Sequence, residues 1–509
     1  MMQLMLNKRV RNQLLSRLIV LFSVIPNVLA APQDGVVVTG SGSINSNITN
    51  TTTVNQNSQS MVVNWSSFNV NANESVNFVQ PSSSAAVLNQ IHDQNPSQIL
   101  GAINANGRVF LSNPNGMVFG SNSVVNVGAL MATNLSISAD DFMAGNYSFS
   151  ASTNSDGAII NQGIIQAATG GSVALIGGSV KNEGVIIANY GHVALATGRQ
   201  ATINFDGDGL INFQIDESVL ENTSGEENAI HNTGSIIADA GQILLSANAS
   251  EGIFTNVINN EGLIKATRIE NVGGVIHLSG NSGRVISSGD ISAVGENGVG
   301  GEVHLLGDQV GLFGDASIDA SGSQGGGVVL IGGDFQGNNP EIKNAQQTYV
   351  GANTSIKADA IDLGDGGKVI VWADEATAFN GAVSAQGGDL IGDGGFVEIS
   401  GKRSLSYDGS VNTGAINGKA GTVLFDPNNI VVSNAGNGDE GANSGTVAFT
   451  TDSTNNSWNV SPAELDAVVG AIVLQAHNDV TFTDAVDLTT SGATLTVQAG
   501  DDIGVNANI

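Results

Sequence analysis

Histidines are the side chains of this sequence with the clearest capacity for metal chemistry. Six occur: His92, His192, His231, His277, His304 and His477. None lies in the His-Glu-x-x-His pattern that places two imidazoles on one helical face for zinc. His277 and His304 occupy equivalent middle positions of two similar segments, Gly-Val-Ile-His-Leu and Gly-Glu-Val-His-Leu. We therefore expect them to be exposed, stacked neighbours, and we predict no metal site.

Carboxylates could bind calcium or act as catalytic acids and bases. Asp-Gly pairs are frequent, as in Asp206-Gly207-Asp208-Gly209 and Asp365-Gly366-Gly367, but the nine-residue Gly-Gly-x-Gly-x-Asp array of calcium-loaded rolls is missing. Turn formation explains these pairs, with incidental calcium binding as the alternative. A polysaccharide-degrading enzyme needs clustered carboxylates, joined by a basic residue in a lyase. Here most Asp and Glu flank glycines and basic residues are few, so we predict no catalytic residue and no cofactor.

Two short motifs alternate along the chain and would position such side chains. The first, Asn-x-Gly-x-Ile-x-Ala, occupies residues 161–167, 182–188, 232–238 and 260–266, and looser copies are centred on Ile291, Ile318, Ile356, Val383 and Val411. The second, Gly-x-φ-x-φ with φ aliphatic or Phe, is centred on Val173, Val193, Ile243, Ile276, Val303, Val329, Val369, Val397 and Val423. Each copy of the first is followed by one of the second, mostly at intervals of about 27 residues after Ile264.

This repeat predicts the fold. Alternation such as Val173-Ala174-Leu175 indicates strands with one buried face. Two strands per repeat, too short to stand alone, would bury that face by stacking on the next repeat. Glycine pairs before the strands (Gly170-Gly171, Gly300-Gly301 and Gly394-Gly395) should provide positive φ at turns.

The predicted fold class is therefore all-β, a right-handed parallel β-helix. A β-sandwich with regular strands would not explain paired motifs in a fixed order. Insertions near residues 210–228 and 334–347 interrupt the repeat, and we expect them to loop out of the coil wall.

The first thirty residues have the features of a cleaved signal peptide read by the Sec translocon. Lys8, Arg9, Arg11 and Arg17 precede an apolar run from Leu18 to Ile25, and cleavage is predicted between Ala30 and Ala31. The run is too short to cross a bilayer about 30 Å thick. The formal charge of −30, with only 16 Lys and Arg, argues against nucleic acid as a partner. The chain has no cysteine, which would suit a second export step through a narrow pore.

The organisation changes after Pro427. Ser461-Pro462-Ala463-Glu464 predicts a helix start, with Ser as N-cap and Glu at N3, and a helix through about Val469. Strand-like sequence resumes from Ile472 to Val497 and ends at Ile509 without a visible cap, which suggests a longer protein. The predicted division is residues 1–30 signal peptide, 31–150 N-terminal domain and cap, 151–427 repetitive β-helix, and 428–509 linker with a short helix and the start of further repeats.

One turn carries a possible recognition signal. Asn113-Pro114-Asn115-Gly116 separates two hydrophobic runs, Val109–Leu111 and Met117–Phe119. Asn at the first position, Pro at the second and Gly at the fourth suit a tight turn. From these residues alone, chain reversal is the simpler interpretation.

In its context this turn resembles the secretion domain of filamentous-haemagglutinin-like exoproteins of two-partner secretion. The similar segments, in family order, are Trp65-Ser66-Ser67-Phe68-Asn69, Val76-Asn77-Phe78, Asn95-Pro96-Ser97-Gln98-Ile99, Val125-Asn126-Val127-Gly128, Gly171 to Gly177 and Asp365 to Ala373. The resemblance covers roughly residues 32–425. Some members have a second tetrapeptide, Asn-Pro-Asn-Leu, that this chain lacks, so a secretion role is carried over only to Asn113, Pro114, Asn115 and Gly116.

The resemblance implies a function. Family members are recognised in the periplasm by a partner outer-membrane β-barrel, through its periplasmic domains, and coil up outside. It implies a secreted or surface-exposed protein, an adhesin of haemagglutinin type with a host or bacterial surface receptor. The alternatives are the delivery portion of a contact-dependent toxin and a β-helical carbohydrate-active enzyme.

Overall fold

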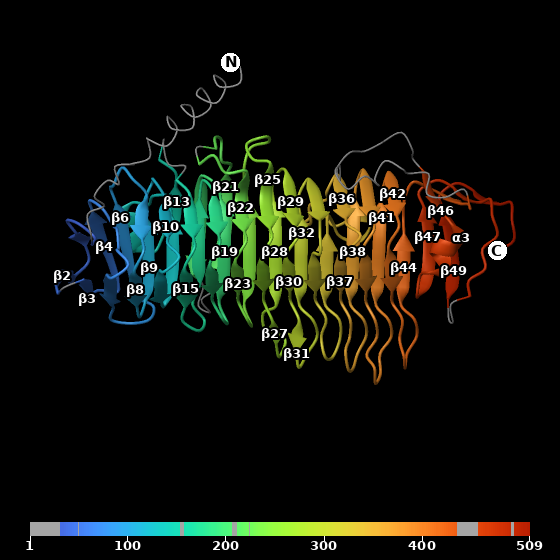
Figure 1. The fold of residues 1–509 in the computed structure, drawn as a ribbon, viewed down its shortest axis with the longest axis horizontal. Coiled ribbons are helices and arrows are strands. Elements are labelled where there is room, and N and C mark those ends of the chain that lie inside the picture. Colours follow the sequence, from blue (N-terminus) through green and yellow to red (C-terminus); the bar gives the residue numbers. More distant parts are fainter. Residues whose placement is uncertain are drawn as a thin grey trace, which may run out of the picture.

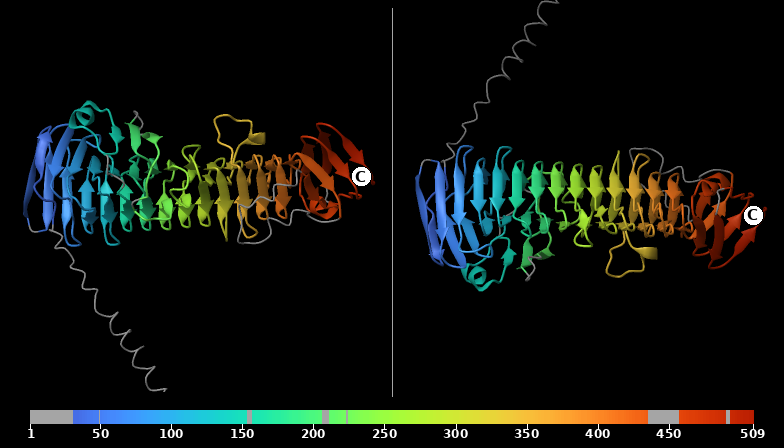
Figure 2. Two further views of the ribbon diagram at one scale, coloured as in Figure 1. Left: turned by 90° about the horizontal axis from the view of Figure 1, so that it is seen from above. Right: turned by 90° about the horizontal axis from the view of Figure 1, so that it is seen from below.

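The protein is a long, narrow rod (Figures 1 and 2). The computed structural model describes residues 31–48, 50–152, 157–205, 211–222, 224–434, 457–489 and 493–509. The expected signal peptide, including Ala30, lies outside the described residues. Within them the chain advances steadily from one end of the rod to the other, so sequence order and spatial order coincide (Figure 1). The fold is the right-handed parallel β-helix that the repeat predicts.

Short alternating segments produce this rod because each coil folds them into three faces. In one coil, β16 (Val173–Gly177) lies on face 1, β17 (Val180–Asn182) on face 2 and β18 (Val185–Ile187) on face 3, before β19 (His192–Thr197) returns to face 1. Each strand pairs in parallel with the equivalent strand of the next coil, as β16 does with β19. On all three faces alternate apolar side chains point inward and form one core along the rod, and a second apolar set on the outside of face 1 packs under the segment of residues 139–150.

The bounds of the strands follow by face. Face 1 comprises β1 (Val36–Thr39), β4 (Ser60–Trp65), β6 (Ala86–Ile91), β9 (Arg108–Ser112), β12 (Ala129–Thr133), β16, β19, β24 (Gln242–Ala247), β28 (Val275–Gly280), β32 (Glu302–Leu306), β35 (Val328–Ile331), β38 (Lys368–Ala373), β41 (Phe396–Gly401), β44 (Thr422–Phe425), β47 (Ala471–Ala476) and β49 (Thr494–Ala499). Face 2 comprises β7 (Ser97–Ile99), β10 (Met117–Phe119), β14 (Ile159–Asn161), β17, β22 (Asn228–Asn232), β25 (Asn256–Asn260), β29 (Arg284–Ser287), β33 (Gln309–Leu312), β36 (Gln347–Val350), β39 (Ala376–Phe379) and β42 (Ser404–Tyr407). Face 3 comprises β2 (Gly42–Ile48), β3 (Thr51–Gln56), β5 (Ser75–Val79), β8 (Ala102–Ala105), β11 (Val124–Val127), β15 (Ile164–Ala167), β18, β23 (Ser235–Ile237), β26 (Leu263–Lys265), β30 (Asp290–Ser292), β34 (Ser317–Asp319), β37 (Ser355–Lys357), β40 (Ala382–Ser384) and β43 (Ser410–Asn412).

The register of the sheets confirms the repeat that the sequence predicts. On face 3, Ile264 is opposite Ile291, which is opposite Ile318, and the row continues through Ile356. On face 1, the residues at the centre of Gly-x-φ-x-φ are opposite one another in the same way, for example Ile276 and Val303. The motif centres therefore form continuous buried rows.

The expectation of two strands per repeat is wrong, because each coil has a third strand on face 2. These strands are short, and their last residue is often the Asn that begins the first motif, as with β17 and Asn182. Only Val180 and Asn182 of β17 are buried. An inward pair of one aliphatic and one polar residue does not stand out as a strand pattern.

The motif Asn forms a ladder inside the wall. The side-chain amide of Asn161 donates to Oδ1 of Asn182 at 2.8 Å, and that of Asn182 donates to Oδ1 of Asn232 at 2.7 Å. Asn232 continues the ladder to Asn260 at 2.8 Å, and all four side chains are fully buried. A buried amide needs hydrogen-bond partners, and here the Asn of each coil is the partner of the Asn in the next coil.

The glycine pairs serve close stacking more than unusual backbone angles. Gly170 has a φ of +79°, but positive φ is wrong for Gly300-Gly301 and Gly394-Gly395, which are absent from the positive-φ residues of the described chain. A Cβ on Gly301 would lie 2.1 Å from the carbonyl oxygen of Gly274 in the preceding coil. The corner glycines are therefore needed because adjacent coils approach there without room for a side chain.

The rod begins with antiparallel pairing. Strand β1 pairs antiparallel with β4, and β2 pairs antiparallel with β3, before parallel stacking starts with β3 and β5. These first strands cover the N-terminal edge of the coils (Figure 1).

Three segments lie outside the coils. Helix α2 (Ala139–Ala144) and β13 (Ser148–Ser150) pack on face 1 through Phe142 and Phe149, which contact Phe110. Strands β20 (Gln200–Phe205) and β21 (Ile211–Glu217) form a hairpin whose first strand pairs with β13. The third segment contains the 3₁₀ turn η1 (Phe335–Gly337) and projects from the rod in Figure 2.

The insertion expected at 210–228 in fact begins before β20, and part of it lies outside the described residues. The third segment matches the insertion expected at 334–347. The α2 segment was not predicted from the sequence.

The last part of the chain continues the rod. Strand β45 (Asn429–Val432) pairs with β46 (Ser457–Val460) and β48 (Val480–Phe482), and β48 pairs with β50 (Ile503–Val505). Helix α3 (Pro462–Asp466) starts with the predicted capping box of Ser461 and Glu464 but ends before Val469. One short parallel pair, formed by β27 (Arg268–Ile269) and β31 (Gly295–Glu296), extends the corner loops of the middle coils. No helix of the described residues is long and apolar enough to cross a membrane.

Candidate functional site: the Asn113–Gly116 turn and two polar clusters on face 1

The turn Asn113–Gly116 joins β9 on face 1 to β10 on face 2 within one coil of the N-terminal region. Its first residue closes the turn: the backbone N–H of Gly116 donates to the carbonyl oxygen of Asn113 at 2.9 Å. The N–H of Asn115 donates to Oδ1 of the Asn113 side chain at 3.0 Å. These contacts confirm the tight turn that the residue types predict.

The Asn113 side chain is fully buried and committed to the fold. Its amide donates to the carbonyl oxygen of Asn95 at 3.1 Å and to Oγ of Ser97 at 3.0 Å. Both acceptors belong to the preceding coil, so Asn113 connects two coils as well as closing its own turn. In the folded rod this side chain has no free surface for a partner.

The other turn residues differ in how much they present outside. Pro114 and Asn115 are half-buried, and the Asn115 amide donates to the carbonyl oxygen of Asp93 at 2.7 Å. Gly116 has a φ of +90°, and a Cβ there would lie 2.3 Å from the carbonyl oxygen of Ala158 in the next coil. Only Pro114 combines partial exposure with a side chain that makes no hydrogen bond. A transporter that recognises all four residues must therefore bind them before this coil has folded.

The neighbouring sequence landmarks also serve the first coils. The indole N–H of Trp65 donates to Oδ1 of the buried Asn89 at 2.9 Å, and its ring meets Phe68 edge-on at a centroid distance of 5.4 Å. Oδ1 of Asn69 accepts from the N–H of Gln98 at 2.8 Å. These residues fix the first coils relative to one another, which the sequence could not reveal.

The first of the two polar clusters on face 1 contains the two histidines that the sequence analysis considered. His277 on β28 is opposite His304 on β32, and the rings stack with centroids 4.2 Å apart and planes 3° apart. The stacking of the rings was expected, but the prediction that both histidines are exposed is wrong for His304, whose side chain is only 9% exposed. Oε1 of Glu302 lies 3.2 Å from Nε2 of His277 and 2.8 Å from Nε2 of His304. Sequence reasoning missed Glu302, although its position two residues before His304 places it on the same face of the strand.

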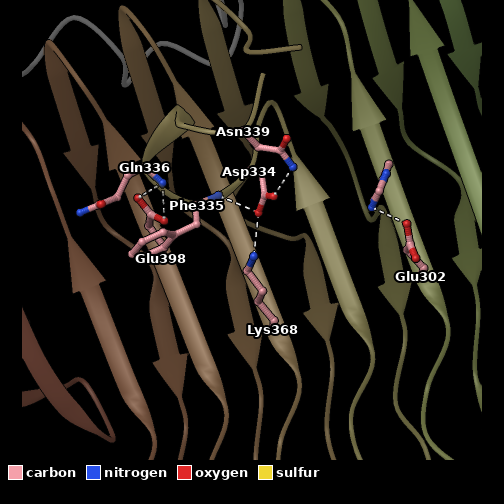
Figure 3. Close-up of polar contacts among 8 residues, drawn as sticks. Glu302, Asp334, Phe335, Gln336, Asn339, Lys368 and Glu398 are labelled. Carbon is pink, nitrogen blue, oxygen red and sulfur yellow. Dashed lines mark hydrogen bonds and ion pairs between the residues drawn. The ribbon is translucent and has the colours of Figure 1, made fainter. Parts of the chain in front are cut away.

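The second polar cluster lies under η1 on the same face of the rod (Figure 3). Glu398 is fully buried, and both its oxygens accept from the N–H of Gln336, at 3.3 and 3.1 Å. Burial raises the pKa of Glu398 to about 8, although hydrogen bonds from Gln336 and Ser400 oppose this rise. Burial likewise raises the pKa of Asp426, which accepts from the Gln336 side chain at 3.0 Å.

An ion pair holds the start of the same loop. Asp334 contacts Nζ of Lys368 at 2.6 Å and accepts from Asn339 at 2.9 Å (Figure 3). Burial alone would raise the pKa of Asp334, but the hydrogen bonds from Lys368, Asn339 and the N–H of Phe335 outweigh it and lower the pKa to about 2. The loop is thus fixed to face 1, and it covers Glu398 instead of leaving it open to a substrate.

Comparisons with known proteins identify the N-terminal half. The family model described as the TPS secretion domain matches residues 28–293. The match therefore extends past residue 150 and includes several coils of the region expected to be repetitive. The crystal structure of the HMW1 secretion domain from Haemophilus influenzae is 30% identical, with a TM-score of 0.62, and the match covers 76% of this chain and 100% of that one.

Curated relatives agree. Two heme/hemopexin-binding proteins of Haemophilus influenzae are each 28% identical, over 271 and 272 residues. The matches cover 52% and 49% of this chain but only 29% and 28% of the relatives. The chain therefore matches less than a third of the length of these curated relatives, while the family model at residues 28–293 includes the Asn113–Gly116 turn. The chain thus belongs to the family of two-partner secretion exoproteins that carry the TPS secretion domain.

Proposed function

We propose that this protein is a secreted or surface-exposed adhesin, exported through the outer membrane by its cognate transporter. Proteins of this family are secreted through the outer membrane, and the TPS domain implies a transporter partner. The observation that carries the proposal is the unbroken passage from the secretion domain into a rod of coils on one continuous core. Such a rod holds binding surfaces away from a cell without any catalytic machinery.

The fold supports export in an unfolded state followed by stepwise coiling. Each coil contacts mainly its neighbours, so folding can propagate from the first coil as the chain emerges. The chain has no cysteine and few aromatic residues, and both features ease passage through a narrow pore. The antiparallel first strands provide a start that needs no earlier coil.

The segments outside the coils are the surfaces we propose for receptor contact. The hairpin of β20 and β21 and the loop with η1 project from the rod (Figure 2). Insertions on a solenoid often form its binding surface. The similarity to heme/hemopexin-binding proteins covers less than a third of those relatives, so we take no ligand for this chain from them.

For the turn, we propose recognition in the periplasm before folding, with Asn113, Pro114, Asn115 and Gly116 as the signal. The test expresses the full chain with and without its cognate outer-membrane transporter and measures the protein found outside the cell. Pro114→Ala removes a half-buried side chain without removing a hydrogen bond. We expect it to reduce export several-fold while the melting temperature of the purified protein hardly changes. The matched control is Pro340→Ala, because Pro340 is exposed in the η1 loop and also follows an asparagine.

Normal export of Pro114→Ala, together with poor export and poor stability of Asn113→Ala, would show that the turn acts only in folding. Export without any barrel partner would contradict the secretion route.

The adhesin role has a separate test. Purified rod, and rod lacking residues 200–217, are assayed for attachment to host cells and to neighbouring bacteria. Attachment that falls on removal of the hairpin supports the proposal. Growth inhibition of neighbouring bacteria by producing cells, without attachment, would favour toxin delivery instead.

A further inference from the structure

The His277, Glu302 and His304 cluster brings three metal-ligating atoms together on the outside of face 1. The parallel register places the two imidazoles on adjacent coils, in the same row. Glu302 and His304 alternate with the buried Val303 on one strand, so both side chains point outward. Among the described residues this is the one group of three His, Asp or Glu side chains whose ligand atoms all lie within 4.8 Å of one another.

The three atoms converge on one point. Both imidazoles direct Nε2 toward the same carboxylate oxygen, at 3.2 and 2.8 Å. The hydrogen bonds from His277 and His304 hold the pKa of Glu302 well below its usual range. One anionic oxygen and two imidazole nitrogens are a common donor set for zinc and related divalent ions.

The surroundings favour a cation bound by these residues alone. The in-register neighbours of the imidazoles are Leu244 on one side and Leu330 on the other. Val275 and Val328 flank Glu302 in its row. Lys368, further along the row of Glu302, is paired with Asp334 (Figure 3). The row of Glu302 thus brings no lysine or arginine against its carboxylate, and aliphatic side chains flank the three ligands on both sides.

We propose that His277, Glu302 and His304 form a binding site for a divalent transition-metal ion, with Zn²⁺ as the first candidate. The ion takes Nε2 of each histidine and a Glu302 oxygen, and water fills the remaining position. Each histidine would bind the ion as the neutral tautomer that carries its proton on Nδ1, so that the Nε2 lone pair faces the metal. The two rings are parallel in the structure, so one imidazole has to rotate before both Nε2 atoms can face a single ion. His277 is the more exposed of the two, with 35% of its side chain accessible, and is the one that rotates. This departs from our expectation from the sequence of no metal site, because Glu302 supplies the third ligand.

A metal at this place would connect two successive coils. The ligands come from β28 and β32, which are neighbours on face 1. A cation there links the strands from outside, in addition to the backbone hydrogen bonds. The site would therefore bind the folded rod and not the unfolded chain, and it would raise the melting temperature as metal is added.

The test is calorimetric titration of the full secreted chain, freed of metal by chelation, with zinc chloride at pH 7.5. We expect one saturable site and a rise in melting temperature as zinc is added. His277→Ala and Glu302→Gln should each weaken binding by about tenfold or more. With Co²⁺ as the probe, the visible absorption of a low-coordinate nitrogen–oxygen site should appear and should be lost in His277→Ala.

The chain contains a matched control. Nε2 of His231 lies 3.1 Å from Oε1 of Glu261. This pair offers one imidazole and one carboxylate but lacks the second imidazole of the proposed site. His231→Ala should leave zinc binding unchanged. Circular dichroism verifies that each variant is folded. Absence of saturable binding by the wild-type chain, equal binding by His277→Ala, or equal losses in His231→Ala and His277→Ala would each overturn the proposal, the last by showing binding through any surface histidine.

Discussion

The Asn182 side chain donates to Oδ1 of Asn232 across 2.7 Å, although 50 residues separate them in the sequence. The intervening residues include the whole hairpin of β20 and β21, which leaves the coil wall and returns to it. The ladder thus continues past an insertion without losing register. An insertion at a coil corner alters only the surface, because the buried rows are fixed on both sides of it.

Removing one member of this ladder should destabilise more than its own coil. In Asn232→Ala, the Asn182 amide loses its shortest hydrogen bond and keeps only contacts of 3.4 Å to carbonyl oxygens, and Oδ1 of Asn260 loses its donor; both side chains are fully buried. Each unsatisfied group costs about 1–3 kcal/mol. We expect a lower urea midpoint of unfolding. Gln162→Ala, which removes an exposed contact with Glu183 from the adjacent surface, is the control, and an equal shift in both variants would argue against the ladder.

A methyl group at a coil corner should prevent close stacking. A Cβ on Gly191 would lie 1.8 Å from the carbonyl oxygen of Gly171 in the preceding coil, which is a backbone atom that cannot move aside alone. Gly191→Ala should lower the free energy of unfolding by about 1–3 kcal/mol or more. Gly504→Ala, where the nearest atom would be 3.6 Å away, should have little effect. Melting curves of both variants compare these outcomes, and a wild-type melting temperature for Gly191→Ala would disprove the stacking argument.

Glu398 should make the rod less stable as the pH rises. The pKa of Glu398 is about 8 in the fold against an ordinary value of 4.5, so the folded chain binds more protons between these two pH values than the unfolded chain. The stabilisation is complete below pH 4.5 and is lost as the pH rises through 8. Asp426 adds a change of the same sign, because its pKa is also raised.

The variant Glu398→Gln keeps an acceptor for the Gln336 N–H but cannot ionise. Its melting temperature should fall less than that of the wild type between pH 5 and 8.5. Glu341→Gln, an exposed carboxyl in the same loop, should follow the wild type. Parallel slopes for Glu398→Gln and the wild type would contradict the pKa shift.

A cross-link formed in the periplasm should stall export. Gln309 and Gln347 are opposite each other on face 2, 38 residues apart in the sequence, and their side chains contact at 2.8 Å. The double variant Gln309→Cys/Gln347→Cys would close a loop before the chain enters the transporter. We expect secretion to fall strongly in an oxidising periplasm and to recover with reductant. Each single cysteine variant serves as a control, and normal secretion of the cross-linked form would count against threading of an unfolded chain.

The sequence predicted the features that repeat and missed those that depend on one contact. Ile264, Ile291 and Ile318 could be aligned because burial selects the same residue type in every coil. Face 2 was missed because strands such as β17 bury only one aliphatic residue. The role of Gly301 was misjudged because a carbonyl oxygen of the preceding coil, and not local backbone geometry, selects glycine there.

The candidate sites show the same limit. The turn was predicted from Asn113 to Gly116, but the burial of Asn113 depends on Asn95 and Ser97 of another coil. Stacking of His277 and His304 followed from the repeat, whereas Glu302 has no equivalent in the neighbouring repeats, since Val275 and Val328 occupy its position. Helix α2 appears once, so no periodicity indicated it.

The hairpin of β2 and β3 gives the rod a direction. Its strands pair through a local turn, so the first surface on which a coil can be laid forms without a template and soon after the N-terminal segment is free. Every later coil requires its predecessor. In the export route proposed above, the order in which coils emerge from the transporter is then also the order in which they become stable, and pulling on the chain from the cell side would have to unfold the newest coil first.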